Sequence, residues 1–230
     1  FMWECPDFFT LGNKRVLMFS PQGMTARGFN HRNLFQSGYL LGDWQPGQPF
    51  VRTSGFVEMD HGHDFYAPQS FLTPDGRRIV IGWLDMWESP LPEQQDGWAG
   101  MLSLPRELSL SNDNRLQMRT AREVESLRQS WLPWPVSRLS NQQVGVAENA
   151  EAMEVVLNWK TSDSDAEQYG LGLGDGLRVY VDAQQQRLVL ERCYPQHSLC
   201  GTRSVPILLC RDLHLRLFID SSSVEVFVNN

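Results

Sequence analysis

The chain of 230 residues is long enough for one large domain or two ordinary ones, and its 41% hydrophobic residues can build a packed core. Its 27 acidic residues outnumber its 20 basic residues and give a formal net charge of −7. That charge argues against a nucleic-acid partner, because phosphates need a basic footprint. The longest apolar runs, at 79–84 and 205–210, are too short to cross a bilayer, so no membrane partner is expected.

Almost every segment has the pattern of a short β-strand. Runs rich in Val, Ile, Phe and Leu are separated by turn residues such as Gly12-Asn13 and Asp75-Gly76. In chain order the predicted strands are 15–20, 36–41, 78–83, 102–104, 177–181, 187–191 and 213–220. We therefore predict an all-β protein.

A weak internal repeat lies in the first half of the chain. Pro6 starts an apolar run, a polar turn and a second run from Arg15, and Pro68 starts a similar unit that continues from Arg78. The offset is 62 residues between the prolines and 63 between the arginines. A β unit with this period indicates propeller blades, because four short strands and their loops need about that length. A sandwich with two similar hairpins is the alternative.

A helix signal separates two β regions. Thr120-Ala121-Arg122-Glu123 has the pattern of a capping box, and good helix formers follow to about Gln129. We expect a short helical connector there. From Ala152 onward, Met153, Val155 and Leu157 alternate as the strands of a sandwich do.

Both ends of the chain look cut. The chain opens at Phe1 without an initiator Met, and a strand at 223–228 leads into Asn229-Asn230, which resembles the opening of a hairpin turn. The expectation is that this sequence is part of a longer protein.

The four cysteines, at positions 5, 193, 200 and 210, fit no paired metal motif. A chain of this length does not need disulfides to fold, so free thiols in a reducing compartment are expected. Nothing in the sequence pairs Cys193 with Cys200.

Glu4 is the first candidate for chemistry. It stands among Trp3, Cys5 and Pro6, and loss of hydration in such surroundings favours a protonated carboxyl, as a general acid requires. The alternative is a glutamate that caps a strand end or pairs with an arginine.

Two further runs place carboxylates beside aromatic side chains, as a carbohydrate site does. One contains Asp64 and Tyr66, and the other contains Trp83 and Asp85. Aromatic residues at strand ends also commonly belong to the core. His61-Gly62-His63-Asp64 resembles a metal motif but lacks the histidine that would complete it, so no metal is predicted.

Several ordered motifs together resemble glycoside hydrolase family 32, the β-fructofuranosidases, and most closely its intracellular bacterial sucrose hydrolases. The resemblance covers essentially the whole chain. The matching runs are Trp3-Glu4-Cys5-Pro6-Asp7, 62–69, 78–84, Trp98-Ala99-Gly100, Leu104-Pro105-Arg106-Glu107-Leu108 and 218–227.

This resemblance implies a fold and a domain organisation. It implies the C-terminal part of a five-bladed β-propeller over residues 1–119 and a helical linker over 120–130. A C-terminal β-sandwich follows over 131–230. The implied protein is cytoplasmic, uses no cofactor and can form a homodimer.

The resemblance also implies a reaction and its residues. Glu4 is the implied general acid/base of a retaining hydrolysis that releases fructose from sucrose, sucrose 6-phosphate or a short fructan. The implied substrate-binding residues are Cys5, Asp64, Tyr66 and Trp83.

The family's nucleophile motif, of N-D-P-N type, and its R-D-P motif do not occur in these 230 residues. Both are expected upstream of Phe1, so the chain alone is expected to be inactive. Three alternatives remain. One is a non-catalytic sugar-binding protein of the same architecture, and another is an inverting pair of Glu4 with Asp64 or Asp85. The third, which the incomplete motif disfavours, is a metal-dependent hydrolase that uses His61 and His63.

Overall fold

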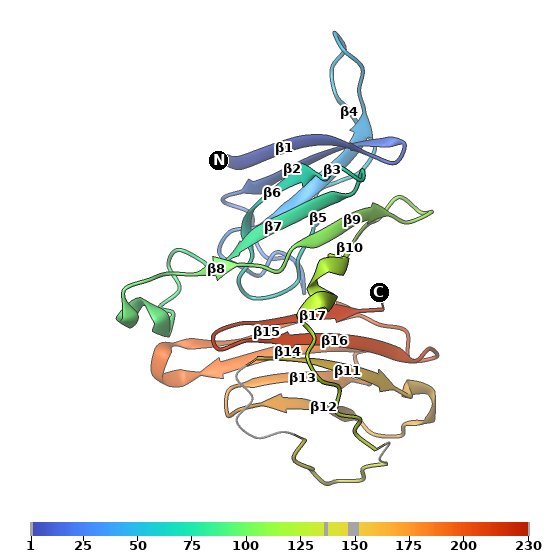
Figure 1. The fold of residues 1–230 in the computed structure, drawn as a ribbon. Coiled ribbons are helices and arrows are strands. Elements are labelled where there is room, and N and C mark those ends of the chain that lie inside the picture. The colour runs from blue at the N-terminus through green and yellow to red at the C-terminus, as the bar shows by residue number, and fades with distance from the viewer. Residues whose placement is uncertain (1, 136–137, 147–151, 230) are drawn as a thin grey trace.

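The computed structural model describes residues 2–135, 138–146 and 152–229, and over these residues the protein is built from β-strands and short 3-10 helices (Figure 1). The all-β prediction is therefore confirmed. Asn230, the second residue of the expected hairpin opening, lies outside the described residues. No helix of the described part is long and apolar enough to span a membrane.

The first half consists of two antiparallel sheets. In the first, the order β1-β2-β3-β4 is extended by β5, which also pairs with β3. Its strands are β1 (Trp3–Leu11), β2 (Lys14–Pro21), β3 (Gly38–Asp43), β4 (Val51–Arg52) and β5 (Val57–Glu58). In the second, the order is β6-β7-β9-β10, and β8 pairs with β7. Its strands are β6 (Tyr66–Leu72), β7 (Arg78–Leu84), β8 (Met101–Leu102), β9 (Arg106–Leu110) and β10 (Leu116–Thr120). A 3-10 helix, η1 (Pro92–Asp96), lies in the β7–β8 connection.

The two sheets of the first half share one core and are arranged like neighbouring propeller blades. Strand β6 lies beside β1 and β2. Alternating apolar side chains from both sheets fill the space between them, as period-2 strands require. The buried cluster consists of Phe9, Val16, Met18, Tyr39, Leu41, Met59, Phe65, Val80 and Leu108.

The internal repeat predicted from the sequence is confirmed in backbone geometry. The β1–β2 pairing shifts register between Glu4 and Asp7, and the β6–β7 pairing shifts between Tyr66 and Gln69. In both strands the residue before the proline has a left-handed backbone, with φ of 47° at Cys5 and 50° at Ala67. Such a bulge re-aims the neighbouring side chains. Glu4 and Tyr66 therefore occupy equivalent positions on adjacent strands.

The second half contains two further antiparallel sheets, which pack face to face on a separate core. One has the order β11-β16-β17, and the other has the order β12-β13-β14-β15. The strands are β11 (Met153–Trp159), β12 (Gln168–Leu173), β13 (Leu177–Asp182), β14 (Arg187–Tyr194), β15 (Leu199–Pro206), β16 (Leu213–Ile219) and β17 (Val224–Val228). Two 3-10 helices, η3 (Thr161–Asp163) and η4 (Pro195–His197), lie in loops. The shared core consists of Val179, Val181, Leu188, Ile207, Leu213, Leu215 and Leu217.

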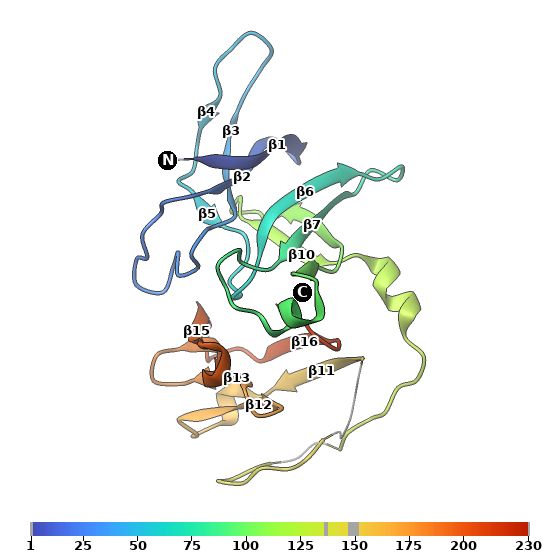
Figure 2. The same cartoon turned by 90° about the vertical axis from the view of Figure 1, so that its left-hand side faces the viewer.

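The connector between the halves contains a short helix, but the start of this helix differs from the predicted capping box. It is a 3-10 helix, η2 (Arg122–Leu127), with Ala121 at its N-cap and no side-chain cap. Thr120 ends β10 and is buried, and the Glu123 carboxylate accepts hydrogen bonds from both Arg77 terminal nitrogens, at 2.6 and 3.0 Å. The predicted capping box is therefore wrong, because Arg77 occupies the carboxylate that would have closed it. After η2 the chain runs down the side of the second half (Figure 2).

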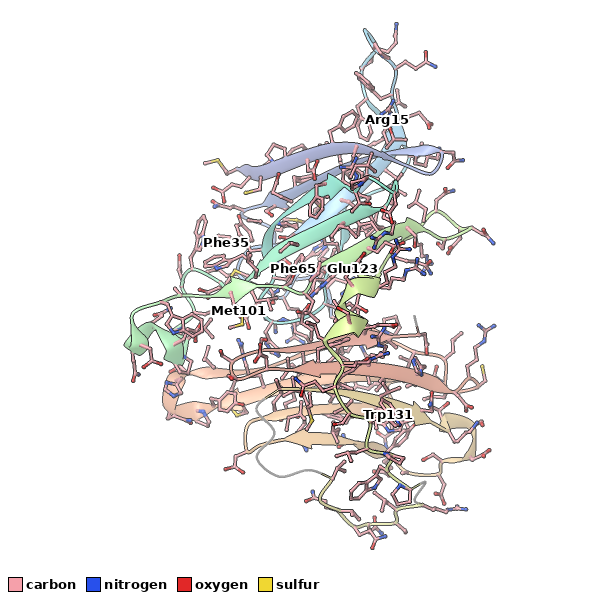
Figure 3. The ribbon with its side chains drawn as sticks, viewed as in Figure 1. Arg15, Phe35, Phe65, Met101, Glu123 and Trp131 are labelled. Carbon is pink, nitrogen blue, oxygen red and sulfur yellow. A yellow bond between two sulfur atoms is a disulfide. The ribbon has the colours of Figure 1, made fainter. Side chains whose placement is uncertain are left out.

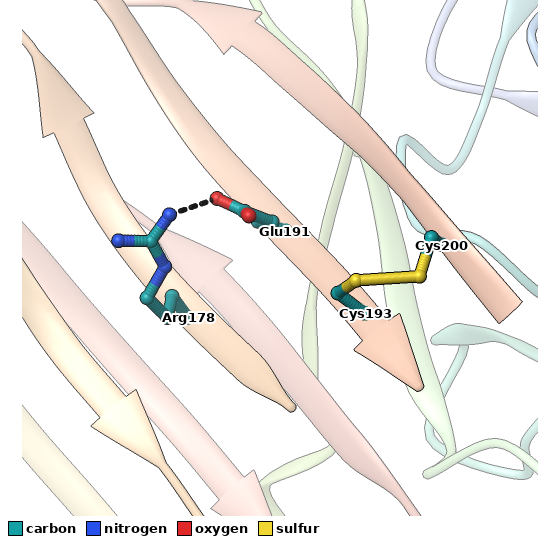
Figure 4. Close-up of a disulfide and its surroundings, with 4 residues drawn as sticks. All are labelled: Arg178, Glu191, Cys193 and Cys200. Atoms are coloured by element: carbon teal, nitrogen blue, oxygen red, sulfur yellow. Dashed lines mark hydrogen bonds and ion pairs between the residues drawn. A yellow bond between two sulfur atoms is a disulfide. The ribbon is translucent and has the colours of Figure 1, made fainter. Parts of the chain in front are cut away.

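The expectation of four free thiols is also wrong. Cys193 and Cys200 face each other across the β14–β15 hairpin and form a disulfide (Figure 4). The chain reverses at η4, midway between the two cysteines, and the β14–β15 pairing then places Cys193 directly opposite Cys200. Cys5 and Cys210 are free.

Candidate active site

An open pocket of about 670 Å³ lies over the two bulges of the first half. It brings together four of the five site residues predicted from the sequence. Its lining consists of Glu4, Cys5, Tyr66, Ala67, Trp83 and Trp87. Trp83 reaches it because β7 pairs Trp83 directly with Tyr66. The pocket is thus formed by the repeated bulge and the end of the neighbouring strand.

The Glu4 carboxylate is held by two neutral donors. The Tyr66 hydroxyl donates to Glu4 Oε2 at 2.7 Å, and Gln22 Nε2 donates to the same oxygen at 3.1 Å. Burial, together with the hydrogen bond to Glu4, raises the pKa of Tyr66 far above its ordinary value, so the hydroxyl stays a donor at neutral pH. Neutral donors orient a carboxylate without attaching a fixed positive charge to it, which suits a group that must gain and lose a proton.

Cys5 lies beside the carboxylate as a thiol. Burial and the neighbouring Glu4 charge both raise its pKa, which disfavours the thiolate form that a nucleophile needs. Its backbone is held as well, because Gln69 Nε2 donates to the Cys5 carbonyl at 3.0 Å. Cys5 therefore shapes the bulge that carries Glu4.

Trp83 is fixed by a close approach of the backbone at Gly100, the last residue of the Trp98-Ala99-Gly100 run. A Cβ at Gly100 would lie 2.2 Å from Trp83 Nε1 and 2.5 Å from the Cβ of Asp85. Gly100 also has a φ of 67°, a conformation that favours glycine. The indole is thus held between the pocket and a backbone that tolerates no side chain.

Trp87 lines the pocket, although the sequence analysis assigned it no role. It is half exposed, and its ring meets those of Tyr66 and Phe35 at centroid distances of 5.5 and 5.4 Å (Phe35 is labelled in Figure 3). Its position in a run of aromatics and carboxylates was the available signal. Its place in the pocket depends on the β7–β8 loop, which the local pattern does not define.

The two aspartates considered beside Glu4 lie elsewhere. Asp64 forms an ion pair with Arg192 of β14, and burial raises the pKa of Asp64 against the opposing pull of that guanidinium. Asp85 is buried and accepts a hydrogen bond from the Met86 amide at 2.5 Å. Burial raises the pKa of Asp85 as well. Neither aspartate is among the residues that line the pocket.

The two histidines of the sequence run differ in burial, with His61 at the surface and His63 in the interior. His63 is buried against the second half, with Nε2 3.4 Å from the Leu190 carbonyl oxygen. Burial, with Arg192 and Arg203 nearby, lowers the pKa of His63 to about 3. Among the residues described, no group of three His, Cys, Asp or Glu side chains is placed to hold a metal ion.

Two family models match this chain and together cover nearly all of it. The N-terminal domain of glycosyl hydrolases family 32 matches residues 1–120, and the C-terminal domain of that family matches residues 123–230. The chain therefore belongs to glycosyl hydrolase family 32. The family predicted from the motifs is confirmed.

Curated relatives match over the whole chain. It is 56% identical over 230 residues to a sucrose-6-phosphate hydrolase of Escherichia coli and 54% identical to a raffinose invertase of the same organism. Each alignment covers 100% of this chain and 48% of the relative. The chain thus spans about half the length of the curated relatives it matches.

Solved structures show the same fold. A Bombyx mori GH32 beta-fructofuranosidase aligns with a TM-score of 0.76 at 32% identity, covering 98% of this chain and 46% of that one. A mutant of that Bombyx mori protein was solved in complex with sucrose and aligns equally well. A sucrose-6-phosphate hydrolase from Lactobacillus gasseri aligns with a TM-score of 0.70 at 22% identity, covering 99% of this chain and 47% of that one.

Proposed function

We propose that this chain supplies the general acid/base of a β-fructofuranosidase that releases fructose from sucrose or sucrose 6-phosphate. The observation that carries the proposal is the Glu4 carboxylate in an open aromatic pocket, held at 2.7 Å by the Tyr66 hydroxyl. The names of the E. coli relatives support the substrate class.

The proposed reaction is retaining and needs two carboxyl groups about 5–5.5 Å apart. A carboxylate from outside this chain attacks the anomeric carbon of the fructosyl unit, while Glu4 gives its proton to the oxygen of the breaking glycosidic bond. Glu4, now ionised, then takes a proton from water, and the hydroxide oxygen displaces the enzyme carboxylate to release fructose. The faces of Trp83 and Trp87 stack on the sugar rings.

The proposal extends to the architecture and the setting. Residues 1–119 form part of a five-bladed propeller, 120–130 form the connector and 131–230 form a β-sandwich. The face-to-face packing of the two sheets in the second half supports the sandwich. The cytoplasmic location and the homodimer stay predictions.

The test uses this chain joined to the part of the E. coli sucrose-6-phosphate hydrolase that it does not match, here called the joined enzyme. Glu4→Gln keeps the shape of the side chain and removes its acid. It should lower sucrose hydrolysis by about 10²–10⁴-fold, the usual contribution of general acid–base catalysis. Glu167→Gln, on an exposed loop of the second half, is the matched control.

The outcomes separate the alternatives. Activity that survives Glu4→Gln would place the proton donor elsewhere. If neither the joined enzyme nor its Glu4→Gln variant hydrolyses sucrose but calorimetric titration shows binding, the protein is a non-catalytic sugar-binding protein and the proposed hydrolase function is wrong. Following the first-formed fructose anomer by NMR distinguishes retention from inversion.

A further inference from the structure

The loop 60–65 leads from β5 into β6 and directly precedes Tyr66, whose hydroxyl donates to Glu4. Several hydrogen bonds and ion pairs fix this loop. Asp60 Oδ2 lies 2.7 Å from Arg106 Nη1, and the Asp60 Oδ1 atom accepts the Gly62 amide at 2.6 Å. Asp64 is paired with Arg192. These contacts follow one another along the loop, so its path is determined by its partners.

Most of these partners depend on the second half of the chain. Arg192 belongs to β14, which also presents the Leu190 carbonyl to His63. Arg106 is buried and is itself held by Glu225 of β17, with Nη2 and Oε2 2.6 Å apart. The second half therefore contacts the loop that supplies the donor to Glu4.

The path from Arg192 to the candidate acid is short. Asp64 precedes Phe65 and Tyr66, residues that are only 2% and 1% exposed. Tyr66 in turn donates to Glu4 Oε2. Because Phe65 and Tyr66 are tightly packed, they have no free space in which to absorb a movement of Asp64. Such a movement is therefore transmitted to the Tyr66 side chain.

We propose that Arg192 is a positioning residue for Glu4. By pairing with Asp64 it fixes the end of loop 60–65 and thereby keeps the Tyr66 hydroxyl on the Glu4 carboxylate. The proposal rests on the proposed function of Glu4. It gives the second half of the chain a part in the acid/base step.

The character of the ion pair favours positioning over general stabilisation. The Arg192 and Asp64 side chains are only 16% and 18% exposed, and Arg192 Nε is buried without a hydrogen-bond partner among the described residues. Such a pair costs desolvation on both sides, so its net stabilisation is small, while its geometry is specific. A neighbouring pair serves as the contrast, because Arg178 and Glu191 form an ion pair on the same sheet (Figure 4) with Arg178 57% exposed.

The first test measures the loop itself and needs no activity. Hydrogen exchange of this chain is followed by mass spectrometry in Arg192→Met and in the control Arg178→Met. Arg192→Met should speed exchange of peptides over residues 60–66 by about tenfold, since the loop loses an anchor and opens locally more often. Arg178→Met should leave those peptides unchanged. Unchanged exchange in both variants overturns the proposal, even if Glu4 is the acid.

The second test measures the coupling in the joined enzyme. Arg192→Met should lower kcat by about tenfold with little change in KM, the pattern of an interaction expressed in the transition state. Arg192→Lys, which keeps the charge, should recover part of that loss. In a Tyr66→Phe background Arg192→Met should cost nothing further, because the hydroxyl it positions is already gone.

If the kcat losses of Arg192→Met and Tyr66→Phe add up in the double variant, Arg192 does not act through the Tyr66 hydroxyl. That result would overturn the positioning role. If Arg192→Met does not fold, Asp64→Asn removes the same pair with a side chain of nearly the same shape and takes its place in both tests. Glu4→Gln on the same joined enzyme reports separately on the proposed function.

Discussion

At the scale of single residues, the candidate site depends on two backbone positions in the left-handed region, which residues other than glycine seldom occupy. Cys5 and Ala67 take left-handed conformations before a proline, and each bulge directs its neighbour, Glu4 or Tyr66, into the pocket. Glu4, Cys5, Tyr66 and Trp83, which the motifs singled out, line one pocket because they lie at or beside these bulges. It could not place Asp64, whose partner Arg192 is 128 residues away.

Gly100→Ala should disturb the site from outside the pocket. The new Cβ would lie 2.2 Å from Trp83 Nε1, so the indole must move, and KM for sucrose in the joined enzyme should rise. Overpacking costs about 1–3 kcal/mol in addition to the strain of the left-handed backbone. Urea unfolding and steady-state kinetics measure the two effects.

Gly97→Ala is the matched control in the same loop. Gly97 has a φ of 85°, but a Cβ there meets nothing within 4 Å. It should show only the backbone cost of about 1–2 kcal/mol and an unchanged KM. Equal KM values for the two variants would contradict the role assigned to the Gly100 contact.

At the scale of elements, strands were predictable and their long-range pairings were not. Period-2 alternation identifies a strand such as β13 or β16, because each needs one buried face. The same reasoning failed at η2, where Arg77 binds the carboxylate of Glu123 across 46 residues. It also failed at the β14–β15 hairpin, where register places Cys193 opposite Cys200. Contacts of this kind are set by the fold and leave no local pattern.

Strand β17 should be energetically tied to the first half through Glu225. Its carboxylate accepts hydrogen bonds from the Leu104 amide at 2.6 Å and from the Arg106 guanidinium. Glu225→Gln leaves the buried Arg106 charge paired with Asp60 alone, and breaking a buried pair typically costs about 3–5 kcal/mol. The free energy of unfolding of the chain in urea provides the measurement.

The control for that prediction is Glu191→Gln, which breaks the pair with the exposed Arg178. Such surface pairs contribute about 0–1 kcal/mol, so this variant should differ little from wild type. A loss for Glu225→Gln no larger than for Glu191→Gln would show that β17 does not depend on the buried pair.

At the scale of the whole molecule, charged side chains that are largely buried form much of the contact between the two halves. Arg106 with Glu225, Arg192 with Asp64, and Arg203 with Asn33 Oδ1 at 2.6 Å all cross between the halves. Burial and the like charges of Arg32 and Arg192 lower the pKa of Arg203 to about 10, so it remains a cation at neutral pH. An interface of this kind is sensitive to any group that changes its charge within it.

His63 should make the stability of the protein fall in mild acid. Burial and the nearby Arg192 and Arg203 charges lower its pKa from 6.5 to about 3, so the folded state binds this proton less readily than the unfolded state. The stabilisation that comes from neutral His63 is complete above pH 6.5. As the pH falls toward 3, the free energy of unfolding decreases by up to about 1.4 kcal/mol per pH unit. Asp64 acts with the opposite sign, because burial raises its pKa and its protonation in acid favours the folded state.

Urea unfolding between pH 7 and pH 5 should therefore show a loss of stability that His63→Gln removes. His61→Gln, an exposed neighbour, controls for the substitution itself. Equal slopes in wild type and His63→Gln would mean that the buried imidazole does not couple the contact between the halves to pH.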